Sequence, residues 1–156
     1  MTPTELEVTD RRILELLAAD GRMSFTDLGK ATGLSTSAVH QRVKRLEQRG
    51  LILGYSAVIN YEAIGLPLTA FISIRPIDPS QADDAPDRLS ATAEIESCWS
   101  VAGEDSYLLK VRVSKPSDLE ELLARIRAVA NVATRTEIVL STYYESRPVT
   151  GSCASD

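Results

Sequence analysis

The chain has 156 residues, of which 44% are hydrophobic and 25% are charged, and it carries a net charge of −5. Its length fits one domain or two small ones, and its composition is that of a globular protein, which excludes a disordered, highly charged chain. No apolar run approaches the ~18 residues of a membrane helix. The two cysteines, Cys98 and Cys153, are too few for a secreted disulfide framework. We therefore expect a cytoplasmic protein with no membrane partner.

Charge is distributed unevenly along the chain. Residues 1–50 hold eight Lys and Arg against seven Asp and Glu, whereas residues 51–156 hold nine against fifteen. An acidic chain with one locally basic segment suggests a nucleic-acid-binding module joined to another domain. The basic residues of that segment, which only Glu47 opposes, are Arg42, Lys44, Arg45 and Arg49.

A first helix is predicted near the start of the chain. Apolar residues at helical spacing follow Thr9 and Asp10, either of which can cap the helix. The pair Asp20-Gly21 ends the pattern, because glycine suits the left-handed position after a helix.

Two further helices are predicted around a tight turn. The sequence Ser24–Asp27 resembles a capping box and opens a helix over 25–32, which Gly33 ends. Ser35 can then cap a helix over 36–49. Two helices joined by a glycine-containing turn, preceded by a third, form a helix-turn-helix.

The last of these helices has the pattern of a DNA recognition helix. Val39, Val43 and Leu46 share its apolar face, and the opposite face is polar and basic. The N-terminal residues of such a helix read bases, while Lys and Arg neutralise phosphates. The alternative interpretation is an amphipathic helix of an unrelated small bundle. The candidate DNA-binding residues are Ser35, Thr36, Ser37, His40, Gln41, Arg42, Lys44, Arg45 and Arg49.

A strand is expected after Gly50. Residues 51–60 are rich in apolar and β-branched side chains, and they could form the wing of a winged-type helix-turn-helix or a connecting strand. A capped turn over 60–65 should follow.

Strands and helices alternate in the second half. The order β-α-β-β-α-β is that of a ferredoxin-like domain, and with the helix-turn-helix it gives the α+β fold class. The last helix should open at the S-x-x-E capping box Ser117–Glu120. The expected strands are 66–75, 95–102, 107–113 and 135–144, and the expected helices are 85–93 and one starting at residue 117.

Both helices of such a domain pack on one face of the sheet. Phe71, Leu108, Val139 and Tyr143 are candidates for the other face. A half-apolar, uncovered sheet face favours pairing with a second copy of the chain.

Taken together, the motifs resemble those of the Lrp/AsnC family of transcription regulators over nearly the whole chain. In the first half the resemblance rests on Asp10–Leu14, Asp20–Arg22, Thr32–Ser35, Arg42–Glu47 and Gly50–Ile52. In the second half it rests on Val101–Val111 and Thr134–Thr136. Each motif alone is weak, but the ordered set across two domains is specific.

The resemblance implies a sequence-specific DNA-binding regulator that responds to a free amino acid. It implies sheet-mediated dimers that often build octamers, association with the nucleoid, and no cofactor or metal. Ser106 departs from the family, where an acidic residue is common at this position. The expected divisions are a helix-turn-helix domain over 1–52, a connecting strand or hinge over 53–65, an effector-binding and oligomerisation domain over 66–146, and a flexible tail over 147–156. The implied effector-binding residues are Gly103, Glu104, Asp105, Ser106, Tyr107, Glu137, Ile138 and Val139.

The residues offer no enzyme site. His40 is the only histidine, and the two cysteines lack metal-ligand spacing. Cys98 is expected to be a small core residue rather than a nucleophile. Two alternatives remain open: an amino-acid-binding oligomeric scaffold that no longer binds DNA, and a DNA-organising protein that needs no effector.

Overall fold

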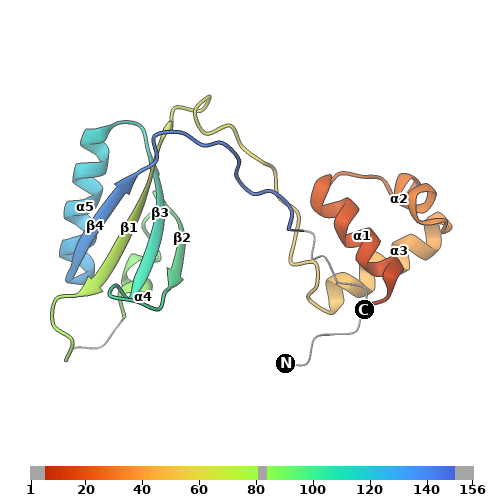
Figure 1. Cartoon of the computed structure of the whole chain (residues 1–156), viewed down its shortest axis with the longest axis horizontal. Coiled ribbons are helices and arrows are strands. Elements are labelled where there is room, and N and C mark those ends of the chain that lie inside the picture. Colours follow the sequence, from red (N-terminus) through yellow and green to blue (C-terminus); the bar gives the residue numbers. More distant parts are fainter. Residues whose placement is uncertain (1–5, 81–83, 150–156) are drawn as a thin grey trace. The chain divides into compact units, whose positions relative to one another are not determined.

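The computed structural model describes residues 6–80 and 84–149 (Figure 1). They form two compact units, one of residues up to Val58 together with those from Tyr144 onward, and one of Ile59–Tyr143. The first boundary lies inside the segment that the sequence marks as a connection. Cys153 and the end of the predicted tail lie outside the described residues. No helix in the described ranges is long and apolar enough to cross a membrane.

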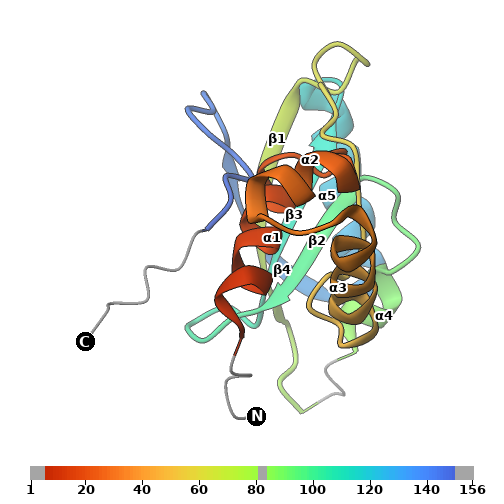
Figure 2. The same cartoon turned by 90° about the vertical axis from the view of Figure 1, so that its right-hand side faces the viewer.

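The first unit is a cluster of three helices around one small core (Figure 2). They are α1 (Val8–Ala19), α2 (Phe25–Thr32) and α3 (Thr36–Gln48). α3 buries an apolar stripe at helical spacing, as the sequence predicts, whereas α1 and α2 each bury one large apolar side chain. The fully enclosed side chains are Ile13 of α1, Leu28 of α2, and Val39, Val43 and Leu46 of α3.

The start of α1 differs from the prediction. The helix begins at Val8 with Glu7 at its N-cap position, and no side chain caps it. Neither Thr9 nor Asp10 is the cap. Asp10 is instead buried in the first turn, where it pairs with Arg42 of α3. The carboxylate that the local sequence suggested as a helix cap therefore forms a tertiary ion pair instead.

The second unit is a four-stranded antiparallel sheet with its helices on one face (Figure 1). Its elements are β1 (Leu68–Pro76), α4 (Ala85–Leu89), β2 (Ile95–Ser100), β3 (Tyr107–Val113), α5 (Pro116–Ala130) and β4 (Val132–Ile138). The strand order β2-β3-β1-β4 is the predicted ferredoxin-like arrangement.

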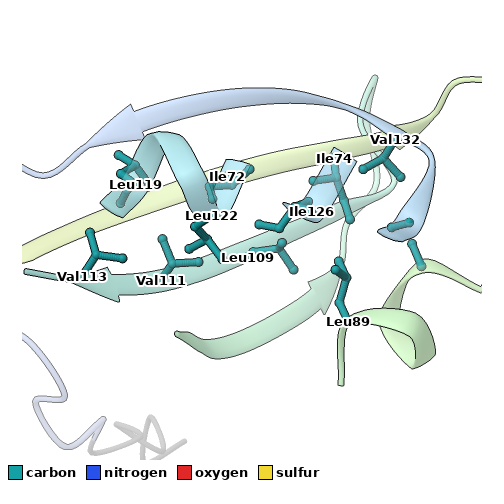
Figure 3. Close-up of a cluster of buried hydrophobic side chains, with 13 residues drawn as sticks. Ile72, Ile74, Leu89, Leu109, Val111, Val113, Leu119, Leu122, Ile126 and Val132 are labelled. Atoms are coloured by element: carbon teal, nitrogen blue, oxygen red, sulfur yellow. The ribbon is translucent and has the colours of Figure 1, made fainter. Parts of the chain in front are cut away.

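The core of this unit lies between the sheet and its helices (Figure 3). Leu122 and Ile126 of α5 point toward Ile72 of β1 and Leu109 of β3, and all four are fully buried. Because strand side chains alternate between faces, Phe71 and Leu108 lie on the face that the helices do not cover.

The expected strand over 51–60 does not form. The segment has no ladder partner among the described residues, and Leu53 and Val58 are both 94% exposed. Strand propensity without a partner leaves backbone donors and acceptors unpaired, so it does not create a strand.

Register with β1 explains the ends of β4. Val132 lies opposite Pro76, the last residue of β1, and Ile138 lies opposite Ala70, near its start. The strand therefore begins before residue 135. One further bond, from Val139 N–H to the Thr69 carbonyl, follows it, and β1 itself starts at Leu68, so no partner remains for a strand that continues to 144. Tyr143 lies beyond the sheet and is 93% exposed.

Both helices of the sheet unit also differ from the prediction at one end. Pro116 occupies the first turn of α5, so Lys115 is the N-cap residue and Ser117 lies inside the helix. Proline favours this place because its missing N–H needs no partner there. The predicted helix over 85–93 stops at Leu89, after which Thr92 N–H donates to the Leu89 carbonyl.

Candidate DNA and effector sites

The turn before α3 depends on two glycines. Gly33 ends α2 with a φ of 73°, and its N–H donates to the Gly29 carbonyl. Gly29 is buried inside α2, where an added Cβ would lie 2.6 Å from the Leu34 carbonyl oxygen. The chain can therefore turn back closely on α2 only because Gly29 has no side chain. Gly33 was predicted from the sequence to end this helix, whereas no role was predicted for Gly29.

The two serines predicted as caps both act as caps. Ser24 Oγ accepts from Asp27 N–H at 3.1 Å and donates to the Asp27 carboxylate at 2.6 Å. This hydrogen bond lowers the pKa of Asp27. Ser35 Oγ accepts from Ala38 N–H at 3.2 Å and lies 3.2 Å from Ser37 Oγ. The start of α3 is thus fixed by its own small polar side chains.

The outer face of α3 is polar, basic and exposed. Eight of the nine residues predicted to bind DNA are exposed, and Arg42 is the exception. Three of the basic ones have no ion-pair partner in the part of the chain that the structure describes, which leaves their charge free for an anionic partner. These three are Lys44, Arg45 and Arg49.

Arg42 is engaged inside the helical unit. Its guanidinium donates to Asp10 Oδ1 at 2.7 Å and to Glu7 Oε2 at 2.8 Å. The two hydrogen bonds, that to Asp10 first, raise the pKa of Arg42. The sequence could not separate this arginine from its basic neighbours, because its partners lie more than thirty residues away.

His40 combines exposure with packing. Its ring meets Phe25 of α2 edge-on, with ring centroids 5.2 Å apart. This contact joins the starts of α2 and α3 on the surface. Beyond α3, the Tyr55 hydroxyl donates to Glu47 at 2.9 Å. Burial is the larger cause and this hydrogen bond the smaller cause that raise the pKa of Tyr55.

The predicted effector loop connects β2 to β3. Its glycine, Gly103, has a φ of 155°, and a Cβ added to it would meet nothing within 4 Å. Ser106 N–H donates to the Ile74 carbonyl, which anchors one end of the loop to β1. Among the described residues no acceptor is recorded for the N–H groups of Gly103, Glu104 and Asp105. The loop therefore offers backbone donors that a carboxylate could accept.

Both acidic side chains of this loop are held by arginines. Arg75 of β1 donates to Glu104 at 2.8 Å, and Arg135 of β4 donates to Asp105 at 2.8 Å. Asp105 is largely covered and Glu104 is exposed. These four side chains line a hollow of about 100 Å³ together with Ala133 and Thr134.

The structure does not bring the two predicted halves of the effector site together within one chain. Tyr107 and Thr134 both lie opposite Ile74, so the loop adjoins the start of β4. Glu137 lies opposite Phe71, about 10 Å further along the sheet at ~3.3 Å per residue. Ile138 and Val139 lie further still. Neither Arg75 nor Arg135 was among the predicted effector residues, although Arg135 lies in the motif Thr134–Thr136 and at the start of a predicted strand.

A second hollow lies at the opposite end of β3. Its volume is about 420 Å³, and Tyr61, Leu66, Glu96 and Arg112 help to line it. The Arg112 guanidinium lies 4.1 Å from the centre of the Tyr61 ring. Glu96 accepts from Arg112 and from the nearly buried Lys110, and these bonds hold the pKa of Glu96 low against the effect of burial.

Cys98 is not the core residue that the sequence predicts. It is exposed because β2 is an edge strand and the five-residue α4 does not extend over it. Partial burial still raises the pKa of the Cys98 thiol, which disfavours the reactive thiolate. Within the described ranges, no group of three or more His, Cys, Asp or Glu could hold a metal ion.

Comparison with known proteins finds the same two-part organisation. Residues 6–47 match the model of the AsnC-type helix-turn-helix domain, and residues 69–149 match that of the Lrp/AsnC ligand binding domain. A curated relative, the HTH-type transcriptional regulator LrpA of Mycobacterium tuberculosis, is 56% identical over 142 residues, which are 91% of this chain and 95% of the relative.

Two similar solved structures contain a bound amino acid. The feast or famine regulatory protein of M. tuberculosis in complex with L-methionine has a TM-score of 0.90 at 55% identity, covering 92% of this chain and 97% of that one. A transcriptional regulator of Neisseria meningitidis in complex with L-Met has a TM-score of 0.81 at 26% identity, covering 90% and 93%.

Proposed function

The chain belongs to the Lrp/AsnC family of transcriptional regulators, and from that premise we propose that it binds operator DNA through α3 and responds to a free amino acid. The observation that carries the DNA-binding part is the outer face of α3. Its exposed cations Lys44, Arg45 and Arg49 have no ion-pair partner among the described residues. We assign the chain a regulatory role, without a catalytic step, at DNA in the cytoplasm.

We assign the base-reading positions to the start of α3. Thr36, Ser37 and Gln41 are exposed, and small side chains near a helix N-terminus allow close approach to a groove. Ser35 holds the first turn, and His40 braces it against Phe25. Lys44, Arg45 and Arg49 would contact phosphates, which gives affinity but little sequence preference.

The salt dependence of DNA binding tests this assignment. Affinity of the full chain is measured at several salt concentrations, with a duplex that the wild-type protein enriches from a random-sequence pool. Replacing Lys44 by Ala should weaken binding and flatten the slope of log affinity against log salt by about one unit. Lys115→Ala is the matched control, since it removes an exposed lysine from the other unit. A Lys44→Ala slope equal to that of wild type would remove this lysine from the interface.

We place the effector at the β2–β3 loop. The hollow beside it is lined by two arginine–carboxylate pairs, so a zwitterion would find an opposite charge for each end by exchanging with these pairs. The loop N–H groups add donors for the carboxylate. Glu137, Ile138 and Val139 lie too far along the same chain, so their contribution would come from a second subunit. Bound L-methionine in two similar proteins supports an amino acid as the ligand class.

Calorimetry with L-methionine, followed by the other amino acids, tests the effector site. Arg135→Gln should weaken binding about tenfold, because Asp105 would lose its partner and a ligand carboxylate its cation. Arg88→Gln, which removes an exposed arginine paired with Asp84 on α4, should change nothing. If no amino acid binds wild-type protein at millimolar concentration, the chain is a DNA-organising protein without an effector.

A homo-oligomer is part of the proposal. Phe71 and Leu108 lie on the sheet face that no helix covers, and Trp99 of the neighbouring strand pairs with Leu108 and is 45% exposed. Burying this face against a second copy would remove apolar surface from water and present two recognition helices to a two-fold site. We propose a dimer as the building block and an octamer as the larger assembly.

A further inference from the structure

We propose that Arg42 is a positioning residue whose ion pair with Asp10 fixes α3 against α1, so that the recognition residues are held at one orientation. This inference rests on the proposed DNA-binding role of α3. It separates Arg42 from Lys44, Arg45 and Arg49, whose sequence neighbourhood is the same but whose side chains point to solvent.

The side chain of Arg42 joins α3 to the start of α1. The guanidinium lies 2.7 Å from Asp10 Oδ1 and 2.8 Å from Glu7 Oε2. Its side chain is only 21% exposed, and that of Asp10 is 8% exposed. Two carboxylates already neutralise this cation, so it has little charge left to offer a phosphate.

Asp10 depends on Arg42. It makes no other side-chain hydrogen bond or ion pair within the described ranges, so its buried charge rests on this one arginine. Removing one member of a buried ion pair is strongly destabilising, because the other charge stays desolvated and unpaired. Glu7 is 63% exposed and can exchange its bond to Arg42 for water, so it contributes less.

The apolar contacts between α1 and α3 fix distance better than orientation. Ile13 of α1 and Val43 of α3 belong to the same small core. Hydrophobic burial is non-directional and tolerates small rotations of a helix about its axis. A charge-assisted hydrogen bond has a required distance and direction. Asp10 lies one turn before Ile13 and Arg42 lies beside Val43, so the ion pair holds the same interface in register.

The positioning role and a phosphate-binding role of Arg42 predict opposite changes in DNA affinity when Asp10 is neutralised. Asp10 is buried and cannot touch DNA, so neutralising it removes a negative charge and frees a cation. If Arg42 bound phosphate, Asp10→Asn would therefore strengthen DNA binding and steepen its salt dependence. If Arg42 positions α3, the same change loosens the helix and weakens binding.

The experiment compares Asp10→Asn with Glu15→Gln in the full chain. Glu15 is the matched control, because it is a carboxylate of α1 that pairs with Arg12 on the surface. The probe is a duplex that wild-type protein enriches from a random pool. We expect Asp10→Asn to lower the affinity about tenfold and Glu15→Gln to leave it unchanged. Arg42→Gln should lower the affinity without lowering the salt slope, unlike Lys44→Ala.

A second measurement needs no DNA. Amide hydrogen exchange of residues 36–48 reports how firmly α3 is held. It should be faster in Asp10→Asn than in Glu15→Gln, at a temperature where circular dichroism shows both variants folded. Equal exchange, tighter DNA binding by Asp10→Asn, or a slope reduced by one unit in Arg42→Gln would each overturn the inference. Failure of wild-type protein to enrich any duplex would instead overturn the proposed DNA binding, and hydrogen exchange would still decide the role of Arg42.

Discussion

At the scale of single residues, the turn between α2 and α3 can close because Gly29 has no side chain. An added Cβ on Gly29 would lie 2.6 Å from the Leu34 carbonyl oxygen, which belongs to the backbone and cannot swing away. We expect Gly29→Ala to destabilise the helical unit. Overpacking costs about 1–3 kcal/mol, and the better helix propensity of alanine offsets only ~1 kcal/mol of it.

The measurement is the thermal midpoint of the helical unit by circular dichroism. Gly54→Ala is the control, because a Cβ there meets nothing within 4 Å and no left-handed φ is required. A midpoint that rises in Gly29→Ala would show that the turn relaxes at no cost. DNA affinity should fall together with stability, since the same turn sets the start of α3.

At the scale of elements, ion pairs join neighbouring strands of the sheet. Glu96 of β2 accepts from Lys110 and Arg112 of β3. Burial raises its pKa, but the two cations outweigh burial and hold the pKa below the ordinary value of 4.5. A lowered folded-state pKa means that this stabilisation is present above pH 4.5 and is lost as the pH falls through the folded-state value.

The sheet unit should therefore lose stability in acid, in part through Glu96. In Glu96→Gln the thermal midpoint should fall at pH 7 and should change less than that of wild type between pH 7 and pH 3. Glu120→Gln on α5 serves as a control carboxylate, for which no salt bridge is recorded among the described residues. If the thermal midpoint fell equally between pH 7 and pH 3 in Glu96→Gln and in wild type, Glu96 would not contribute to the loss of stability in acid.

At the scale of the whole molecule, the uncovered sheet face sets the expected assembly. Leu108 lies on that face, next to Trp99 and Ser73 on the adjoining strands. Replacing Leu108 by Asp would place a charge in a dry interface, which is costly when the charge has no partner. Sedimentation should show wild-type protein as a dimer or larger and Leu108→Asp shifted toward monomer at micromolar concentration.

The control for assembly is Val129→Asp, on the half-exposed outer side of α5, which should leave the oligomer intact. Wild-type protein that sediments as a monomer would contradict the proposed interface. Loss of the dimer should also weaken DNA binding, because two linked recognition helices bind more tightly than one.

Much of the fold was predictable because it depends on local sequence. The sequence predicts the bounds of α2 and β3 as observed, since Ser24, Gly33 and strict alternation are signals carried by adjacent residues. The exposed face of α3 was predictable for the same reason. The shortened β4, the absent strand over 51–60 and the exposure of Cys98 were not, because each depends on which partner strand or helix lies alongside.

The sequence by itself determined that this chain has a helix-turn-helix, a ferredoxin-like sheet unit and a basic α3. Hydrophobic periodicity, helix caps and turn residues depend on residues only a few positions apart, so they can be recognised in a single sequence. Only the tertiary structure decided that Arg42 is bound by Asp10 and Glu7, and that Arg75 and Arg135 hold the acids of the effector loop. Those partners are about thirty residues apart in the chain. Sequence alone does not tell which charged residues form a pair, because the pairing depends on which of them folding brings together.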